Sequence, residues 1–259
     1  MKQTKLYGEE KQQIMNMPLT RQFDEICSTG CAIAGYTSGL CGEWTKERFI
    51  LLAEELGTDA AKITVANQHH TDEVHVMGMD DAGKGYNIPQ GEDFYDAMIT
   101  DQPGLMLSVH TADCVPVVIV DPMKKNIGIA HSGWAGSSKR IAGKTVRKMI
   151  DVYGSNPSDI IICMGPYNHS CCYEVGEDVL GCFRSAFSDS ECEQMFKKKE
   201  AEGKYLLDLG KAISIALCQE GVLEENIHDS GYCTYHTDEY SSWRLTRYKK
   251  HQILTYLMI

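Results

Sequence analysis

The chain has 259 residues, 43% of them hydrophobic, and its formal net charge is −11 because 36 acidic side chains outnumber 25 basic ones. This composition is typical of a globular protein with a substantial core, so we expect one domain over residues 1–259, with residues 1–20 as a loosely ordered N-terminal segment. The negative charge disfavours nucleic acid as a partner, and the lack of an apolar run of roughly 20 residues, or of an apolar leader, predicts no membrane span and a cytoplasmic location.

The first half of the chain is predicted to hold one helix and then a series of short strands. The helix covers residues 45–56, because Thr45 stands at its capping position, apolar residues recur at helical spacing, and Gly57 ends it. The strands cover residues 62–66, 73–77, 104–110, 115–121 and 126–131. The run VPVVIVD at 115–121 has no polar alternation, which is typical of a strand buried on both faces.

The second half alternates helices and strands. We expect a helix at 137–153, a strand at 160–164, helices at 176–186 and 209–220, and a β-rich C-terminal end. The charged run from 197 to 204 is predicted to be a solvated connection inside the domain. Strands clustered early and interleaved with helices later indicate an α/β (α+β) sandwich with mixed sheets and flanking helices.

Three predicted strand ends carry candidate metal ligands, namely His70, Cys114 and His131. A rigid scaffold often presents functional groups at such positions. Two imidazoles and one thiolate suit zinc, and a catalytic zinc site keeps a fourth position open. The same donors would bind copper more tightly. Spacing alone also allows His131 to cap a strand and Cys114 to be a core thiol.

Other polar residues lie next to these ligands in the sequence. Asp113 precedes Cys114, and its carboxylate is expected either to orient a histidine or relay protons, or to be a solvated strand-end group. His110 lies on the same approach, where it either touches a substrate or packs inside the strand. Arg244, beside aromatic residues, is either surface packing or a group that binds phosphate or stacks on a base.

The segment MGPYNHSCCYEVGEDV follows the strand predicted at 160–164. Its Glu174 stands at the start of a predicted helix, where backbone amides can receive an anion. Cys171 and Cys172 are neighbours, so in an extended segment their side chains would point to opposite faces. We therefore expect them to be packing residues.

Several of these segments resemble, in order, the motifs of the YfiH-like, laccase-domain family. QHH at 68–70 is similar to its Q-x-H motif, TADCVPVVIVD to T-A-D-C-x-P, and AHSGWAG to H-x-G-W-x-G. Further matches are DQPGLMLSV, GPYNHSCCYEV, DLGKAI, the Cys-Thr pair at 233–234, and the aromatic-Ser-x-aromatic-Arg ending at Arg244. Together the matches span residues 51–244.

The resemblance implies a single α/β sandwich domain that binds zinc through His70, Cys114 and His131. It also implies phosphorolysis of adenosine, inosine and methylthioadenosine, or deamination of adenosine, with purine nucleoside and phosphate as partners. Cys114, Asp113 and His131 are then expected in catalysis, with Asp113 or Glu174 as a proton carrier. Gln68, His110, Glu174 and Arg244 are expected to bind substrate. A multicopper centre is disfavoured, because no His-x-His pair occurs in the chain.

Two departures from the family pattern concern phosphate. Ala135 stands where relatives often have arginine or lysine, and residues 27–40 read CSTGCAIAGYTSGL in place of an arginine-containing Thr-Arg-x-Gly-Gly-x-Ser segment. Both remove positive charge. Arg244 is then the cation expected to meet phosphate.

Two other interpretations compete with a zinc-dependent nucleoside enzyme. In one, Cys114 is the nucleophile and His131 the base of a cysteine hydrolase acting on amide bonds, or the same site edits peptidoglycan precursors. In the other, the metal is structural in a binding protein, with His69, His110 or Cys172 as a fourth ligand. The sequence leaves the preferred purine, the physiological metal and the oligomeric state open.

Overall fold

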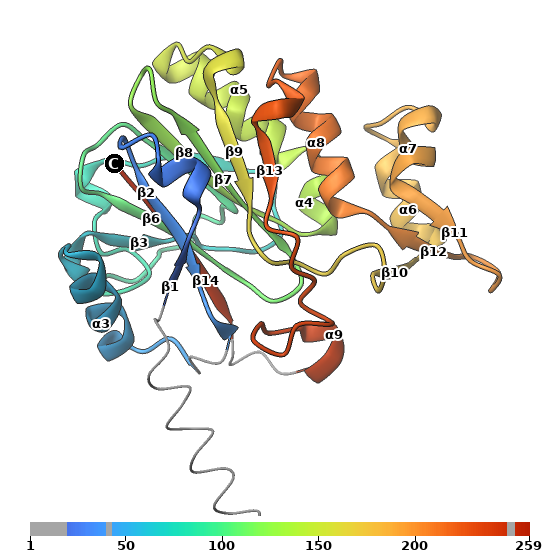
Figure 1. Ribbon diagram of the computed structural model, residues 1–259, viewed down its shortest axis with the longest axis horizontal. Coiled ribbons are helices and arrows are strands. Elements are labelled where there is room, and N and C mark those ends of the chain that lie inside the picture. Colours follow the sequence, from blue (N-terminus) through green and yellow to red (C-terminus); the bar gives the residue numbers. More distant parts are fainter. Residues whose placement is uncertain (1–19, 40–42, 248–251) are drawn as a thin grey trace, which may run out of the picture.

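The computed structural model describes residues 20–39, 43–247 and 252–259, which form two large β-sheets packed face to face with helices on both outer sides (Figure 1). The expected α/β sandwich with mixed sheets is therefore confirmed. The segment expected to be loosely ordered, 1–20, lies outside the described residues except for Thr20, which begins strand β1. No helix in the described ranges is long and apolar enough to cross a membrane.

The first sheet has five strands and is covered on its outer face by helix α3 (Lys46–Leu56). Its strands, in spatial order, are β1 (Thr20–Gln22), β2 (Ile33–Thr37), β14 (Ile253–Met258), β6 (Met106–Thr111) and β3 (Ile63–Val65). Phe49 and Leu52 of α3 pack on Ile63 and Met106 of this sheet. Helix α3 matches the prediction closely because both of its sequence signals are local: an N-cap at Thr45 and a left-handed glycine at Gly57.

The second sheet has six strands, and the candidate ligands lie at one end of these strands. Its strands, in spatial order, are β13 (Ile227–Asp229), β9 (Ile161–Met164), β7 (Val115–Asp121), β8 (Asn126–Ser132), β5 (Ala97–Thr100) and β4 (Val74–Val76). Every residue of β7 is buried, as its uninterrupted apolar run predicts. Val118 and Val120 face the first sheet, while Val117 and Ile119 face the helices.

Helices lie on the other face of the six-stranded sheet: two of them pack directly on its strands, and the others, with a small third sheet, pack against those two and against one another. The helices are α4 (Trp134–Ser138), α5 (Ile141–Tyr153), α6 (Glu177–Arg184), α7 (Asp189–Met195) and α8 (Leu209–Gln219). The third sheet comprises β10 (Glu174–Gly176), β12 (Lys204–Leu207) and β11 (Phe196–Lys198). The remaining elements are α2 (Asp24–Cys27), α9 (Trp243–Thr246), and the 3-10 turns Ala60–Lys62, Met79–Asp81, Pro157–Asp159 and Glu224–Asn226.

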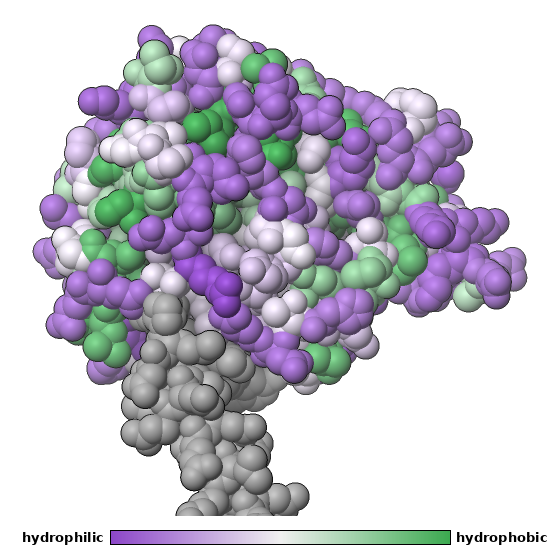
Figure 2. Space-filling view, viewed as in Figure 1, coloured by the Kyte–Doolittle hydropathy of each residue, from purple (hydrophilic) through white to green (hydrophobic). Residues whose placement is uncertain are grey.

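The structure places the start of one predicted helix differently. The helix expected at 137–153 begins only at Ile141, because Arg140 adopts a left-handed conformation (φ 62°) that separates α5 from α4. The Arg140 guanidinium lies over the Phe187 ring, which helps to hold this turn. The charged run 197–204 is exposed and joins β11 to β12 as a hairpin, which agrees with the solvated connection that was expected, and hydrophilic side chains cover that tip of the molecule (Figure 2).

Candidate metal centre and its cleft

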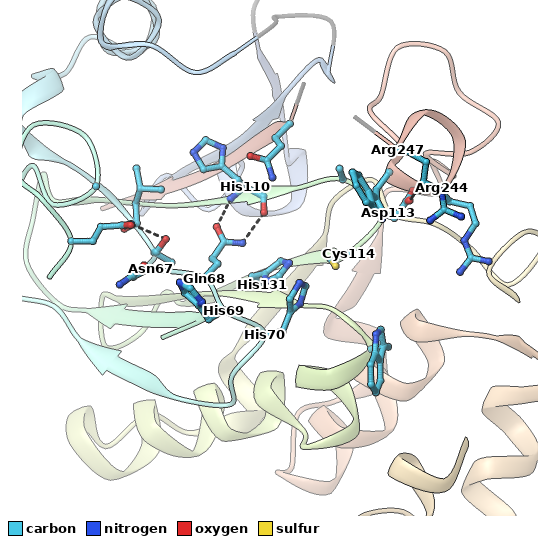
Figure 3. A pocket seen from close by; sticks show the side chains of 18 of the residues that line it. Asn67, Gln68, His69, His70, His110, Asp113, Cys114, His131, Arg244 and Arg247 are labelled. Carbon is cyan, nitrogen blue, oxygen red and sulfur yellow. Dashed lines mark hydrogen bonds between the residues drawn. The ribbon is translucent and has the colours of Figure 1, made fainter. Parts of the chain in front are cut away.

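A cleft of about 860 Å³ opens at the end of the sheet where β7 begins and β8 ends, and all three candidate ligands line it (Figure 3). Strands β7 and β8 are antiparallel, with Pro116 opposite His131, so Cys114 and His131 lie at the same end of the sheet. Strand β4 runs parallel to β5, with Val74 opposite Ala97. The loop before β4, which carries His70, therefore lies at this end of the sheet too.

The donor atoms of His70, Cys114 and His131 lie within 4.8 Å of one another. The two imidazole ring centroids are also 4.8 Å apart. His131 is buried, Cys114 is half-buried and His70 is exposed, so the cluster is closed on the protein side and open toward the cleft. His70 and the residue before Cys114 both have positive φ, 58° and 84°. Non-glycine residues in this conformation often mark functional sites.

Asp96 fixes the geometry of this cluster, although the sequence analysis did not identify it. Its fully buried carboxylate contacts His131 Nδ1 at 2.7 Å, and it accepts hydrogen bonds from the backbone N–H groups of His69, His70 and Thr71. The Asp96 carbonyl also accepts from His131 N at 2.7 Å. One residue thus orients His131 through its second nitrogen and shapes the His70 loop. The sequence signal was a carboxylate placed directly before the apolar run AMI.

The charges around His131 perturb two pKa values. Burial alone would lower the pKa of His131, but the thiolate of Cys114 and the carboxylate of Asp96 raise it to about 9. Burial likewise opposes ionisation of Asp96, while His131 and the backbone donors lower the pKa of Asp96 to about 2. Three nearby donors and a carboxylate that holds a histidine from behind are the arrangement found around zinc in many enzymes.

The space between the donors is shaped by Gly133. A Cβ atom at that position would lie 2.8 Å from Cys114 Sγ and 2.9 Å from His70 Nδ1. Its φ of −75° suits any residue, so the glycine is needed for close approach and not for backbone freedom. The donor set and the space kept by Gly133 therefore fit one metal ion.

Asp113 is buried, but its carboxylate binds Thr234 and Arg244, and Asp96 is the carboxylate that orients His131. Its Oδ1 accepts from Thr234 Oγ1 at 2.7 Å, and its Oδ2 accepts from Arg244 N at 2.6 Å. Asp113 therefore anchors the C-terminal wall of the cleft, including the start of α9.

Gln68 and His110 both line the cleft, and the side chain of Gln68 is hydrogen-bonded to the backbone of His110. Gln68 Nε2 donates to the His110 carbonyl at 2.7 Å, and His110 N donates to Gln68 Oε1 at 2.8 Å (Figure 3). Burial, helped by the charge on His131, lowers the pKa of His110 to about 4, so its ring is neutral at pH 7. Gln68 thus fixes the loop before β4, which also carries His70, to strand β6.

Glu174 and Arg244 are placed differently from each other. The Glu174 carboxylate pairs with Lys199, and Glu174 is not among the residues lining the cleft. Arg244 does line it: its guanidinium lies 5.1 Å from the Tyr173 ring centroid and donates to the Glu174 carbonyl at 2.7 Å. Arg247, which the sequence analysis did not single out, also lines the cleft. Both arginines lie on the α9 side of the cleft (Figure 3).

Aromatic side chains complete the cleft. Trp134, at the start of α4, and Trp243, at the start of α9, are each more than a third exposed, and Tyr173 is buried beside Arg244. Ala135 is half-buried and is not a lining residue. The altered segment 27–40 contributes no described residue to the cleft lining, and Leu40 lies outside the described residues.

Comparison with known proteins gives a consistent picture. The family described as multi-copper polyphenol oxidoreductase laccase matches residues 42–258. A purine nucleoside phosphorylase from Bacteroides thetaiotaomicron is 30% identical over 241 residues, which cover 89% of this chain and 88% of that protein. The human purine nucleoside phosphorylase LACC1 is 31% identical over 202 residues, covering 76% of this chain but only 43% of the human protein.

Two further similarities bear on activity and on fold. A protein named adenosine deaminase RL5, from an unknown prokaryotic organism, is 32% identical over 201 residues, covering 76% of this chain and 75% of that protein. The crystal structure of the hypothetical protein YfiH from Bacillus licheniformis superposes with a TM-score of 0.86 at 27% identity, covering 95% of this chain and 98% of that one.

Proposed function

The chain belongs to the multi-copper polyphenol oxidoreductase laccase family, and on that premise we propose that it is a zinc-dependent purine nucleoside enzyme. The proposed main reaction is phosphorolysis of adenosine, inosine and methylthioadenosine. Phosphate attacks C1′ of the ribose, the bond from C1′ to the purine nitrogen breaks, and the base leaves with a proton, giving a free purine and ribose 1-phosphate, or 5-methylthioribose 1-phosphate when methylthioadenosine is the substrate. Relatives named purine nucleoside phosphorylase support this reaction type.

The observation that carries the proposal is the meeting of three features in one cleft: the His70, Cys114 and His131 donors, two arginines, and aromatic rings. A volume of about 860 Å³ is of the size that holds drug-sized ligands. A nucleoside and a phosphate need these three features together, because they present an anion, a sugar and a flat base.

We assign the phosphate to the α9 side of the cleft. Arg244 and Arg247 bring two guanidinium groups into a protein whose formal charge is −11, so positive charge is concentrated where an anion would bind. The Asp113 carboxylate accepts from Arg244 N, and the Glu174 carbonyl accepts from the Arg244 side chain. Asp113 is thus a positioning residue for Arg244.

We assign the base to the aromatic walls. Trp134 and Trp243 are partly exposed at the cleft, and a purine ring stacking on such faces gains contact area without a specific hydrogen-bond pattern. This arrangement suits an enzyme that accepts more than one purine.

His70, Cys114 and His131 would hold the zinc ion, with Asp96 orienting His131 from behind. When bound, zinc supplies positive charge that attracts and polarises an oxygen-bearing reactant. The chain's own contribution is to aim the donors, to keep the space beside Gly133 clear, and to leave the exposed side of His70 open to the cleft.

The test is to incubate purified protein with inosine and phosphate, with and without a chelator, and to quantify hypoxanthine and ribose 1-phosphate by chromatography. We expect both products, in equal amounts, only with phosphate and metal present. A His70→Ala variant, whose exposed ring takes no part in the core, is the matched negative control. Absence of a free purine and a sugar 1-phosphate with all three substrates, inosine, adenosine and methylthioadenosine, would overturn the proposal.

Deamination of adenosine is a second activity of the same site, favoured by the similarity to adenosine deaminase RL5. Water replaces phosphate as the reactant, the bond between C6 and the exocyclic nitrogen breaks, and inosine and ammonia form. Adenosine incubated without phosphate distinguishes the two reactions. Inosine without adenine indicates deamination, whereas adenine that requires phosphate indicates phosphorolysis.

The cysteine hydrolase interpretation has its own structural support, because Cys114, His131 and Asp96 lie in the order nucleophile, base and orienting acid. It predicts that metal-free protein hydrolyses amide or peptidoglycan-precursor substrates through a covalent acyl-cysteine. If chelated protein forms such an adduct, detected by mass spectrometry, and zinc inhibits it, the hydrolase replaces the nucleoside enzyme.

A further inference from the structure

Three cysteines and a histidine gather at a second place, separate from the His70, Cys114 and His131 cluster. Cys171 and Cys172 come from the turn that follows β9, and Cys233 and His236 come from the segment after β13. One ligand atom from each of the four residues lies within 4.8 Å of the other three. The two clusters share no residue.

The backbone brings these segments together. Tyr167 and Cys233 form a parallel bridge, Tyr167 N donates to the Tyr232 carbonyl, and Thr234 N donates to the Tyr167 carbonyl. Cys171 and Cys172 do not lie in an extended segment as expected, because Cys172 N and Tyr173 N both donate to the His169 carbonyl in a tight turn. Both thiols lie beside His236, and Cys171 is exposed, so the expectation that both cysteines are packing residues is wrong for Cys171.

The spacing of the donors matches a tetrahedral zinc site. With zinc–sulfur bonds of about 2.3 Å and zinc–nitrogen bonds of about 2.05 Å, two sulfurs on one zinc are about 3.8 Å apart, and a sulfur and a nitrogen about 3.6 Å. The Sγ atoms of Cys171 and Cys233 are 3.7 Å apart. The Nδ1 atom of His236 lies 3.7 Å from Cys171 Sγ and 3.8 Å from Cys172 Sγ, whereas its Nε2 atom lies 3.2 Å from Cys172 Sγ, so Nδ1 is the ring nitrogen whose distances fit a shared zinc ion.

We propose that Cys171, Cys172, Cys233 and His236 form a second zinc site with a closed set of four protein ligands. Three thiolates and one imidazole are a recurrent structural zinc set, and a full tetrahedron leaves no position for substrate. The cluster therefore differs in kind from the open three-donor site. Cys171 and His236 are exposed, so the ion can enter from solvent.

The site would act as a clamp on one wall of the cleft. Asn168 N donates to the Asp113 carbonyl, and Thr234 Oγ1 donates to the Asp113 carboxylate. Asn168 precedes the two cysteines by a few residues, and Thr234 follows Cys233 directly. Zinc would thus tie together the two segments that hold Asp113, the residue before Cys114.

The test is the zinc content of the full-length protein, which is expressed with added zinc and purified in the presence of a reductant. The content is measured by inductively coupled plasma mass spectrometry. We expect two zinc ions per chain in the wild type, one in His70→Ala, one in His236→Ala, and none in the double variant. Cys182→Ser, which removes an exposed cysteine outside both clusters, should retain two. His236→Cys should also retain two, because it replaces one zinc ligand by another.

A cobalt spectrum gives a second readout, which for the wild type does not depend on the folding of a variant. Cobalt bound to three thiolates absorbs more strongly in the thiolate-to-metal charge-transfer region than cobalt bound to one. We therefore expect the wild type to show several times the band intensity of protein with a single bound thiolate, and His236→Ala to lose most of it.

Two results would overturn the second site. One is a wild-type content of a single zinc that His70→Ala abolishes and His236→Ala leaves unchanged. The other is a Cys171–Cys233 disulfide, detected by peptide mapping of the protein as isolated, because the two sulfurs would then be bonded to each other and unable to bind zinc as thiolates.

Discussion

At the residue scale, Asp96 connects the parts of the first metal centre. Asp96→Asn keeps the size of the side chain but removes the charge that faces His131 Nδ1. Loss of such a partner typically lowers metal affinity ~10–100-fold. Competition with a chelator of known affinity measures this change. Unaltered affinity in a folded Asp96→Asn protein would show that the carboxylate has no orienting role.

Gly133 gives a prediction based on space alone. Gly133→Ala has no backbone penalty at φ −75°, yet its Cβ would meet Cys114 Sγ and His70 Nδ1 at less than 3 Å. We expect the variant to fold but to lose most metal at the first site. Gly181→Ala is the matched control, because an added Cβ meets nothing within 4 Å there. If Gly133→Ala binds metal as tightly as the control does, the metal does not use the space beside Gly133.

The candidate ligands were predictable from the sequence, but their support was not. His70, Cys114 and His131 stand inside recognisable motifs at strand ends. Asp96 does not, because its role depends on β5 lying beside β8, a pairing between segments about 30 residues apart in the sequence. The four-donor cluster of Cys171, Cys172, Cys233 and His236 likewise depends on contacts between distant segments.

At the element scale, helix α9 and the residue that follows it supply two arginines to the cleft, Arg244 and Arg247. Arg247→Ala removes one guanidinium from the cleft. A hydrogen bond to a charged group contributes about 1.5–3 kcal/mol, so we expect the KM for phosphate to rise ~10–100-fold with little change in Tm. Steady-state kinetics at varied phosphate measures it. Arg184→Ala, an exposed arginine of α6, should leave the KM for phosphate unchanged.

If Arg247→Ala changes the KM for the nucleoside and not that for phosphate, the α9 side binds the base or sugar instead. The same kinetic data distinguish the two outcomes, since both substrates are varied independently.

Element boundaries were predicted well where the signals are local. Thr45 and Gly57 mark α3, and the apolar run marks β7. The break at Arg140 was not predictable, because no glycine or proline marks it and the Phe187 ring that contacts Arg140 is distant in sequence. Strand β5 and the β11–β12 hairpin were missed for a similar reason: short strands take their structure from neighbours that the local sequence does not show.

At the scale of the whole molecule, the pKa values predict how metal and pH together affect stability. In metal-free protein, protonated His131 stabilises the fold fully below its ordinary pKa of 6.5, and this stabilisation is lost as the pH rises through about 9. Asp96 stabilises above its ordinary pKa of 3.8, and this is lost only as the pH falls toward about 2. Of these two groups, His131 is therefore the one whose contribution to stability changes between neutral pH and pH 9.

Because a metal competes with the proton on His131, we expect zinc to raise Tm more at about pH 8.5 than at about pH 6. Thermal unfolding of chelated and zinc-loaded protein measures the difference, and the His236→Ala background isolates the first site. A gain in Tm that is the same at both pH values would mean that His131 does not bind the metal.

The most direct test of the proposed function is a zinc titration of metal-free protein in the presence of inosine and phosphate, with hypoxanthine and ribose 1-phosphate as the readout. We expect both products to appear as zinc fills the His70, Cys114 and His131 site, and to be absent at every zinc concentration in His70→Ala. Full activity in chelated protein, or zinc-dependent activity that survives in His70→Ala, would contradict a nucleoside enzyme whose reaction depends on this site.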